Sequence, residues 1–332
     1  MSIQGTILPY MGEGVGRVET LKSEVFYRPR KKRTCDNLTC LFAAGYNALT
    51  ISLFGDFMGV NGYSPSAVSF PIQRKLEKNV RTAIISDIHG NVESLNRVLE
   101  DIGDLNIDQT VCLGDTLGYG PNPVECVDLV AKHCEWSLLG NHDYGALYEP
   151  TNFNAAAEQA AYWTRAQFDA EENKEVAGKR WEFLGSLRVR TQMNDFLCVH
   201  GTPRRPINEY LFPDDAINSP VKMKQIFDRI PKHSMSGHTH IPGIFTDEPD
   251  FYPPDDVDGT FNFENENHII INPGSVGQPR DLDPRLSYAI LDDETNTVDF
   301  FRLDYDIETV REKIYAIPEL SNWLGDRLRE GR

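Results

Sequence analysis

From residue 80 onward, short apolar runs alternate with longer stretches in which apolar positions recur at helical spacing. The first three pairs are 82–86 with 92–102, 110–113 with 123–133, and 136–139 with 155–168. This alternation predicts βαβ units and a largely parallel sheet. Four later apolar runs, at 196–199, 268–271, 287–291 and 298–303, have few helical stretches between the last of them. We therefore predict a second, more antiparallel sheet packed on the first, in an α/β fold with a two-sheet β-sandwich flanked by helices.

The same pattern divides the chain into three expected parts: an N-terminal extension at 1–79, a main domain at 80–305 and C-terminal helices at 306–332. The extension lacks a sustained hydrophobic period and is expected to be a linker or a disordered segment. Ile307, Val310 and Ile314 lie at helical spacing, and Pro318 breaks the run. These C-terminal helices are expected to pack on the main domain. Residues 247–258 are rich in Asp, Glu and Pro and are interpreted as an extended acidic surface loop.

Charge narrows the choice of partners. The formal charge of the 332 residues is -17, and residues 1–79 contribute +4 of it, from ten Lys and Arg against six Asp and Glu, which leaves -21 for the remainder. Duplex nucleic acid is not expected as a partner, because an acidic surface gains nothing from the release of counterions. A small phosphate ester remains compatible with this charge if a metal ion supplies local positive charge.

Two features bear on the cellular compartment. A basic run at 28–33 precedes a moderately apolar stretch at 38–55, but polar residues interrupt that stretch, so we expect no stable membrane span. The six cysteines show no CxxC spacing and are interpreted as mostly core thiols. We expect a cytoplasmic protein, with export or anchoring through residues 28–55 as the alternative. The oligomeric state is left open.

Polar side chains follow five of the predicted strands. Asp87 and His89 come directly after the first strand, and alternate residues of an extended chain point to the same side, so the two can bind one cation. The other clusters are Gly114-Asp115, Gly140-Asn141-His142-Asp143, His200-Gly201 and Gly237-His238-Thr239-His240. Sites in open α/β sheets assemble outside the carboxyl ends of the strands. We therefore expect all five clusters to converge. His133, His233 and His268 lie outside this series and are expected to be structural or exposed to solvent.

This ordered series resembles the calcineurin-like metallophosphoesterase superfamily, over about residues 80–305. Residues 87–91, 118–123 and 272–280 are similar to its small bacterial and archaeal phosphodiesterase branch. The resemblance implies a four-layer αββα fold and two divalent metal ions that activate a water molecule to attack a phosphate ester. Mixed imidazole, amide and carboxylate ligands suit Mn, Fe, Zn or Ni better than Mg or Ca.

The resemblance also implies a role for each residue of the series. The ligands of one metal would be Asp87, His89, Asp115 and His240, and those of the other would be Asp115, Asn141, His200 and His238. Asp115 would bridge the two ions. His142 would stand beside the scissile phosphate, with Asp143 orienting its ring. Arg204, Arg205 and Arg280 are candidates for binding a second phosphate, with surface ion pairing as the alternative interpretation.

The expected function is hydrolysis of small phosphodiesters or phosphomonoesters. One alternative is a nucleotide pyrophosphatase or protein phosphatase of the same superfamily. The residues after Asp115 weaken that alternative, because they lack the Arg found soon after Gly-Asp in the protein phosphatases, whose Glu is also replaced by Asp143. The other alternative is a non-catalytic scaffold, and the complete ligand series argues against it.

Overall fold

The computed structural model of the chain describes residues 80–332. The predicted N-terminal extension, including the segment at 28–55, lies outside the described residues. Cys112, Cys126, Cys134 and Cys198 are free thiols, and all of them except Cys134 are buried. Among residues 80–332, no helix combines the length and the apolar character that crossing a membrane requires.

The first sheet is mixed and has six strands. Their order is β3 (Trp136–Ser137), β2 (Gln109–Cys112), β1 (Arg81–Ile85), β11 (Leu286–Asp292), β12 (Thr297–Leu303) and β9 (Thr260–Asn262). β1 pairs in parallel with β2 and antiparallel with β11. The sequence predicted a largely parallel first sheet, and this is correct only for the half formed by β1, β2 and β3.

The second sheet is also mixed. Its order is β4 (Arg190–Met193), β5 (Phe196–Val199), β6 (His233–Met235), β10 (Ile269–Asn272), β7 (Gly243–Thr246) and β8 (Asp250–Tyr252). Its inner strands β5, β6 and β10 are parallel to one another. The prediction that the late apolar runs share the second sheet is therefore wrong for β11 and β12, which extend the first sheet. An apolar run indicates a buried strand, but it carries no information about which strand it pairs with.

The main core fills the space between the two sheets. Ile84 of β1 and Val111 of β2 point into this layer, where they meet Met235 of β6 and Ile271 of β10. Ile85, the next residue along β1, points to the opposite side and lies in a separate outer cluster. Because both faces of strands such as β1 and β10 are buried, most of their residues are apolar, and this made them detectable in the sequence.

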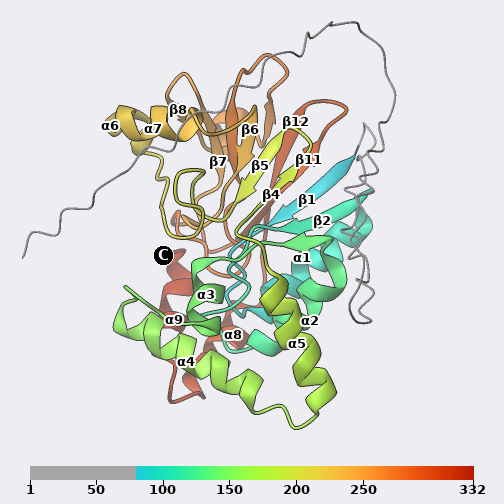
Figure 1. Cartoon of the computed structure of the whole chain (residues 1–332), viewed down its shortest axis with the longest axis vertical. Helices are drawn as coiled ribbons and strands as arrows, with labels where there is room; N and C mark the ends of the chain where they lie inside the picture. Colours follow the sequence, from blue (N-terminus) through green and yellow to red (C-terminus); the bar gives the residue numbers. More distant parts are fainter. Residues whose placement is uncertain (1–79) are drawn as a thin grey trace, which may run out of the picture. The chain divides into compact units, whose positions relative to one another are not determined.

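Helices cover the outer faces of both sheets (Figure 1). These are α1 (Val92–Asp104) and α2 (Pro123–His133) on the first sheet, and α6 (Asp215–Asn218) and α7 (Pro220–Phe227) on the second. Val98 of α1 packs with Ile85, and Ile226 of α7 packs with Phe245 of β7. Asn91 caps α1, because its side chain accepts a hydrogen bond from the backbone N–H of Ser94. The result is the predicted α/β sandwich with four layers, αββα.

The remaining helices lie beside the ends of the strands (Figure 1). They are α3 (Asn141–Leu147), α4 (Ala155–Asp169), α5 (Lys174–Ser186), α8 (Ile307–Tyr315), α9 (Trp323–Asp326) and the short 3-10 helix η2 (Arg327–Glu330). Ile314 of α8, Leu324 of α9 and Leu328 of η2 form one buried cluster with Tyr119 and Ala160. The C-terminal helices therefore pack against the loop that contains Tyr119, a position that becomes important at the functional site.

The acidic stretch at 247–258 is not a plain surface loop. Part of it is β8, which pairs antiparallel with β7, and another part is the 3-10 helix η1 (Pro254–Val257). Tyr252 and Val257 pack against the core between the sheets. The acidic residues obscured this strand, because its two apolar residues, Phe251 and Tyr252, lie among many charged residues and prolines.

His233 is a structural histidine, in agreement with its place outside the ligand series. Its ring is buried against Phe196, with the centroids 5.0 Å apart, and against Phe263 at 5.3 Å. Its Nδ1 accepts a hydrogen bond of 3.2 Å from the backbone N–H of Ile269, which requires the neutral ring. Burial, assisted by the charge of Lys232, lowers the pKa of His233 to about 4.

We predict that His233 contributes to acid sensitivity. The unfolded chain takes up a proton near pH 6.5, whereas the folded ring does so only near its lowered pKa of about 4, so stability is complete above pH 6.5 and falls as the pH drops between these values. In urea unfolding at pH 7 and pH 5, His233→Asn, whose side-chain oxygen replaces Nδ1 as the acceptor, should lose about 1–2 kcal/mol less than the wild type over this interval. An equal loss in both proteins would contradict this assignment.

Candidate metal centre

The loops that follow β1, β2, β3, β5 and β6 meet at one edge of the sandwich, as the positions of the five clusters predicted. Backbone hydrogen bonds connect these loops directly. The N–H of Asp87 donates to the carbonyl of Gly114 at 3.0 Å, and the N–H of His89 donates to that of Asp115 at 2.9 Å. The loop after β6 joins them, since the N–H of Gly237 donates to the carbonyl of His200 at 2.8 Å. The main chain alone therefore brings distant segments together.

The backbone of this region is strained. Five candidate ligands have a positive φ, in the left-handed region: Asp87 at 54°, His89 at 51°, Asp115 at 52°, His238 at 68° and His240 at 61°. Residues with a Cβ rarely adopt this conformation, which persists only where the surroundings enforce it. The strain turns these side chains toward a common centre, and such outliers concentrate at functional sites.

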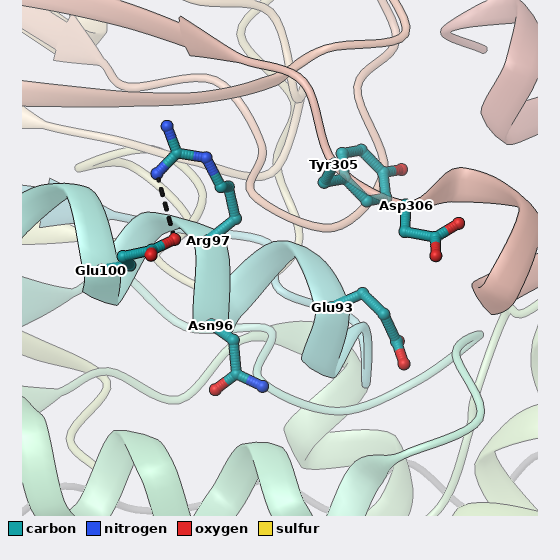
Figure 2. A pocket seen from close by; sticks show the side chains of 6 residues that line it. All are labelled: Glu93, Asn96, Arg97, Glu100, Tyr305 and Asp306. Atoms are coloured by element: carbon teal, nitrogen blue, oxygen red, sulfur yellow. Dashed lines mark ion pairs between the residues drawn. The ribbon is translucent and has the colours of Figure 1, made fainter.

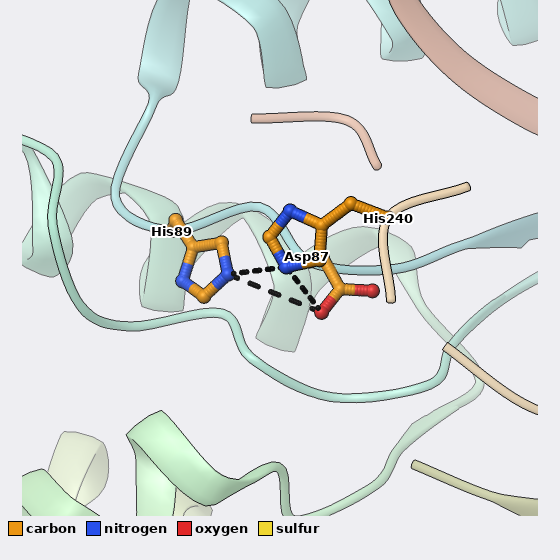
Figure 3. Close-up of side chains that lie close together, drawn as sticks. All are labelled: Asp87, His89 and His240. Carbon is orange, nitrogen blue, oxygen red and sulfur yellow. Dashed lines mark hydrogen bonds and ion pairs between the residues drawn. The ribbon is translucent and has the colours of Figure 1, made fainter. Parts of the chain in front are cut away.

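One group of candidate ligands consists of Asp87, His89 and His240 (Figure 3). The Nε2 atoms of His89 and His240 lie 3.1 Å apart, and Oδ1 of Asp87 lies 3.2 Å from Nε2 of His240. All three side chains are buried. Oδ1 of Asp87 has no hydrogen-bond partner, although its other oxygen accepts from the N–H of His238 at 3.0 Å. A buried carboxylate oxygen without a partner is costly, and a cation at this point would satisfy it.

A second group consists of Asp115, His200 and His238. Nε2 of His200 lies 3.2 Å from Nδ1 of His238 and 3.2 Å from Oδ1 of Asn141, so the amide oxygen faces the same point. Each of the four side chains is buried or nearly so. The combination of a carboxylate, two imidazoles and an amide oxygen is a donor set that divalent transition metals accept.

Asp115 lies between the two groups. Its Oδ2 is 3.3 Å from Nε2 of His200 in the second group and 3.7 Å from Nε2 of His89 in the first. Its Oδ1 accepts a hydrogen bond of 2.8 Å from the backbone N–H of His142, and this bond fixes the orientation of the carboxylate. Of the described acidic residues in these groups, Asp115 is thus the one placed to reach two cations at once.

The surroundings fix which ring nitrogen of each histidine points inward. Nδ1 of His89 lies 2.9 Å from the carbonyl of Leu117, and Nδ1 of His200 lies 3.0 Å from that of Leu113. Since a carbonyl only accepts, each Nδ1 carries a proton, and in the neutral ring each Nε2 presents a lone pair to the centre. Histidine ligands of metals commonly have this arrangement, in which an outer acceptor orients the ring.

The ionisation of the cluster also suits cations. Although burial opposes it, the neighbouring imidazole of His240 lowers the pKa of Asp87, and that of His200 lowers the pKa of Asp115. Both groups are therefore carboxylates at neutral pH. Burial, with the charge of His142 next, lowers the pKa of His89 well below its usual value. Metal ligands must be deprotonated, and these environments favour that state in Asp87, Asp115 and His89. Although burial opposes it, the carboxylate of Asp115 raises the pKa of His200 to about 9, so a cation that binds here must displace a proton from that ring.

Residues 80–271 match the family described as calcineurin-like phosphoesterase, and this match covers more than half of the chain. The chain belongs to the calcineurin-like phosphoesterase family. Members of this family are hydrolases that use divalent metals. All of the candidate metal ligands of this chain lie within the matched residues.

Three proteins of other organisms are similar to this chain over most of their length. Uncharacterized protein MJ0912 of Methanocaldococcus jannaschii is 38% identical over 260 residues, which is 75% of this chain and 98% of that protein. The crystal structure of a metallophosphoesterase from Sphaerobacter thermophilus is 35% identical, with a TM-score of 0.64, and covers 76% of this chain and 100% of its own. Hypothetical protein PH1004 from Pyrococcus horikoshii OT3 has a TM-score of 0.60 at 18% identity, with 76% and 99% covered, and shows the shared fold alone.

His142 stands at the edge of the candidate metal centre. Its ring packs on Tyr119, with centroids 4.3 Å apart, and on Phe153 at 4.6 Å. A Cβ at Gly118 would lie 2.4 Å from Nδ1 of His142, so only glycine fits beneath the ring. The ring is buried and its Nδ1 has no hydrogen-bond partner. A ring held this firmly with a free nitrogen suits a contact with substrate.

Asp143 does not orient His142, contrary to the expectation from the resemblance. Its carboxylate accepts hydrogen bonds from the backbone N–H groups of Asp115 at 2.8 Å, Leu117 at 3.0 Å and Gly140 at 3.0 Å. Asp143 lies in the first turn of α3, so its side chain folds back over the helix N-terminus instead of following the ring of its neighbour. We therefore assign it to positioning of the Asp115 loop.

The three candidate arginines differ in their surroundings. The guanidinium of Arg204 forms an ion pair with Glu209 and is not free to bind phosphate. Arg205 is exposed, and its contacts with Thr202 come from its backbone. Arg280 lies beside the metal centre, because its backbone N–H donates to the carbonyl of His240 at 3.4 Å.

Two tyrosines near the metal centre were not singled out by sequence reasoning. Tyr119 packs on both His89 and His142, with centroids 4.8 and 4.3 Å apart. The ring of Tyr210 stacks on His238 at 3.8 Å. Tyr119 lies in a glycine-rich stretch that resembles the family, which was a usable signal. Tyr210 lies in an irregular segment after β5, where no spacing rule identifies a contact with His238.

A cavity of about 530 Å³ lies away from this centre, next to α1 (Figure 2). Its lining residues are Glu93, Asn96, Arg97, Glu100, Tyr305 and Asp306. Three carboxylates against one guanidinium make it unsuitable for an anionic phosphate ester. Its one arginine is also paired with Glu100 at 3.6 Å.

We predict that Asp143→Ala lowers the free energy of unfolding by about 2–4 kcal/mol, because it leaves three buried backbone N–H groups without an acceptor. Asp143→Asn should recover only part of this loss, since its amide N–H₂ faces other donors. Urea unfolding at neutral pH measures the effect. Asp169→Ala, at the exposed end of α4, is the matched control and should change stability by less than about 0.5 kcal/mol. Similar losses at both positions would contradict the assignment.

Proposed function

We propose that this protein is a metal-dependent phosphoesterase that hydrolyses small phosphodiesters or phosphomonoesters at a centre of two divalent ions. The observation that carries the proposal is the position of Asp115, whose Oδ2 is near His89 on one side and His200 on the other. A single carboxylate shared between two buried donor groups suits a pair of cations better than one ion.

The proposed ligands follow from the two groups. One ion would be held by Asp87, His89, Asp115 and His240, and the other by Asp115, Asn141, His200 and His238. When bound, such a pair activates water and stabilises negative charge on the phosphoryl oxygens. The unpartnered Oδ1 of Asp87 and the inward lone pairs of the histidines support this fit. The donor types favour Mn, Fe, Zn or Ni.

The chain's own residues would place the substrate. The buried ring of His142 would hold a phosphoryl oxygen or the leaving oxygen, and the guanidinium of Arg280 would bind a further oxygen of the substrate. Four positive charges of two ions exceed the two negative charges of Asp87 and Asp115. The loaded centre would therefore attract an anion although residues 80–332 carry a formal charge of -21.

The net charge and the free thiols of the chain bear on the substrate and the location that we propose. The acidic surface disfavours duplex nucleic acid. The free thiols of the described residues fit a reducing compartment. We therefore keep the cytoplasm as the proposed location.

The proposal predicts hydrolysis of bis(p-nitrophenyl) phosphate or p-nitrophenyl phosphate after loading with Mn, Fe, Zn or Ni. EDTA treatment should abolish the activity, and one of these metals should restore it. Asp115→Ala should lose most of both ions, measured by elemental analysis, because it removes the shared ligand. If no metal supports hydrolysis of either ester although two ions are bound, the protein is a scaffold and the proposal is wrong.

A second prediction separates metal binding from chemistry at neighbouring residues. Asn141→Ala should weaken one metal site and lower the bound metal from about two ions toward one. His142→Ala should keep both ions and lower kcat by about 10²–10⁴, the usual range for acid–base assistance. Its loss should be smaller for a substrate with a good leaving group. Because His142 also lies within reach of His89 and Asp115, an equal loss of metal in the two variants would make it a ligand.

A further inference from the structure

Among residues 80–332, most partly buried arginines form an ion pair with Asp or Glu, but two of them do not. The partly buried arginines with a carboxylate partner within 4.0 Å are Arg81, Arg97, Arg180, Arg204, Arg302 and Arg311. Arg280 and Arg327 are also partly buried, but among residues 80–332 neither has an Asp or Glu within that distance. In a body this rich in acidic residues, two partly buried arginines without an Asp or Glu partner are an exception that needs an explanation.

Arg280 lies at the wall of the metal centre. Its guanidinium is 5.8 Å from the ring centroid of Tyr119, which in turn packs on His89 and His142. One terminal nitrogen donates to the side-chain oxygen of Gln278 at 2.9 Å. Its Nε is buried and has no partner. Most of the donor capacity of this guanidinium is therefore unused within the protein.

Arg327 belongs to the C-terminal helices, and its neighbours in the sequence contact the Tyr119 cluster and the loop of Arg280. The next residue, Leu328, packs in the buried cluster that contains Tyr119. The segment that follows is tied to the loop of Arg280, because the N–H of Leu282 donates to the carbonyl of Gly331 at 2.9 Å. The guanidinium of Arg327 stacks on Trp323 at 4.4 Å, and its Nε donates to the carbonyl of Arg332.

The two guanidiniums influence each other. Burial, and next the positive charge of Arg280, lower the pKa of Arg327 to about 10. Tyr119 and Tyr210 are the other groups whose charge acts on Arg327. Two like charges that act on each other in a partly dehydrated place are unfavourable unless an anion binds near both of them. Guanidiniums bind phosphate through two parallel hydrogen bonds, which makes the phosphate group the best-fitting anion.

We propose that Arg280 and Arg327 form a second phosphate-binding position beside the metal centre, so that the preferred substrate is a phosphoester carrying another phosphate group. This inference rests on the proposed function, since the metal centre would cleave the first phosphate. It adds Arg327, which no sequence signal identified, as a specificity-determining residue. The aromatic rings of Tyr119 and Tyr210, which pack on His142 and His238, would contact the organic part of the substrate.

A matched pair of substrates tests the inference. Thymidine 5′-(p-nitrophenyl phosphate) and its 3′-phosphorylated form differ by one phosphate group. The metal-loaded wild type should show the higher kcat/KM for the phosphorylated form, and Arg327→Gln should reduce that preference by about tenfold. Arg327→Lys should keep part of it, because it keeps the charge and loses the paired hydrogen bonds. Arg329→Gln, an exposed arginine of the same turn paired with Glu308, should leave the preference unchanged.

A second measurement does not depend on catalysis. In EDTA-treated protein, inorganic phosphate should raise the Tm of the wild type and of Arg329→Gln more than that of Arg327→Gln, at constant ionic strength. If Arg327→Gln and Arg329→Gln respond alike to phosphate, or keep the same substrate preference, the second position does not exist. If neither thymidine substrate nor either of the two nitrophenyl esters is cleaved with any metal, the proposed function fails, and the phosphate shift alone then decides whether the arginines bind anions.

Discussion

The structure depends most on one constraint: two carboxylates and several imidazoles must be buried together with their lone pairs facing inward. Polar groups in such a place are stable only if the protein fixes each of them from outside. Backbone carbonyls hold the outer nitrogens of His89 and His200, and backbone N–H groups hold Asp87 and Asp115. The positive φ values of the candidate ligands are the local cost of this arrangement, and the bonds between loops offset it.

Much of the fold could be predicted, because the buried strands are apolar on both faces and short. Pairing could not be predicted, since β11 joins β1 across about 200 residues of sequence and neither run specifies its neighbour. The candidate site was easier, because each ligand follows a strand directly and the carboxyl ends of strands converge. The hydrogen bonds that support the candidate ligands were harder to predict. The side chain of Asp143 turns back to the main chain, and nothing in the order of residues shows which way it turns.

The contrast among arginines has the same origin. Arg204 looked favourable because it lies four residues after His200, but Glu209 is close enough to neutralise it. No motif or spacing in the sequence singled out Arg327. Its position depends on how the C-terminal helices pack on Tyr119, which is a property of the tertiary structure. Closeness to a ligand in the sequence therefore did not show which arginines have a guanidinium free to bind an anion.

The C-terminal helices have a consequence for how this enzyme family diversifies. The family match ends at residue 271, and it contains every candidate ligand, whereas Arg280 and Arg327 lie beyond it. Catalytic machinery and substrate selection would then occupy separate stretches of the gene. Recombination or drift in the last sixty or so codons could change what is cleaved while the metal centre is inherited intact. Sorting relatives by that terminal stretch would divide them into groups that their shared ligands conceal.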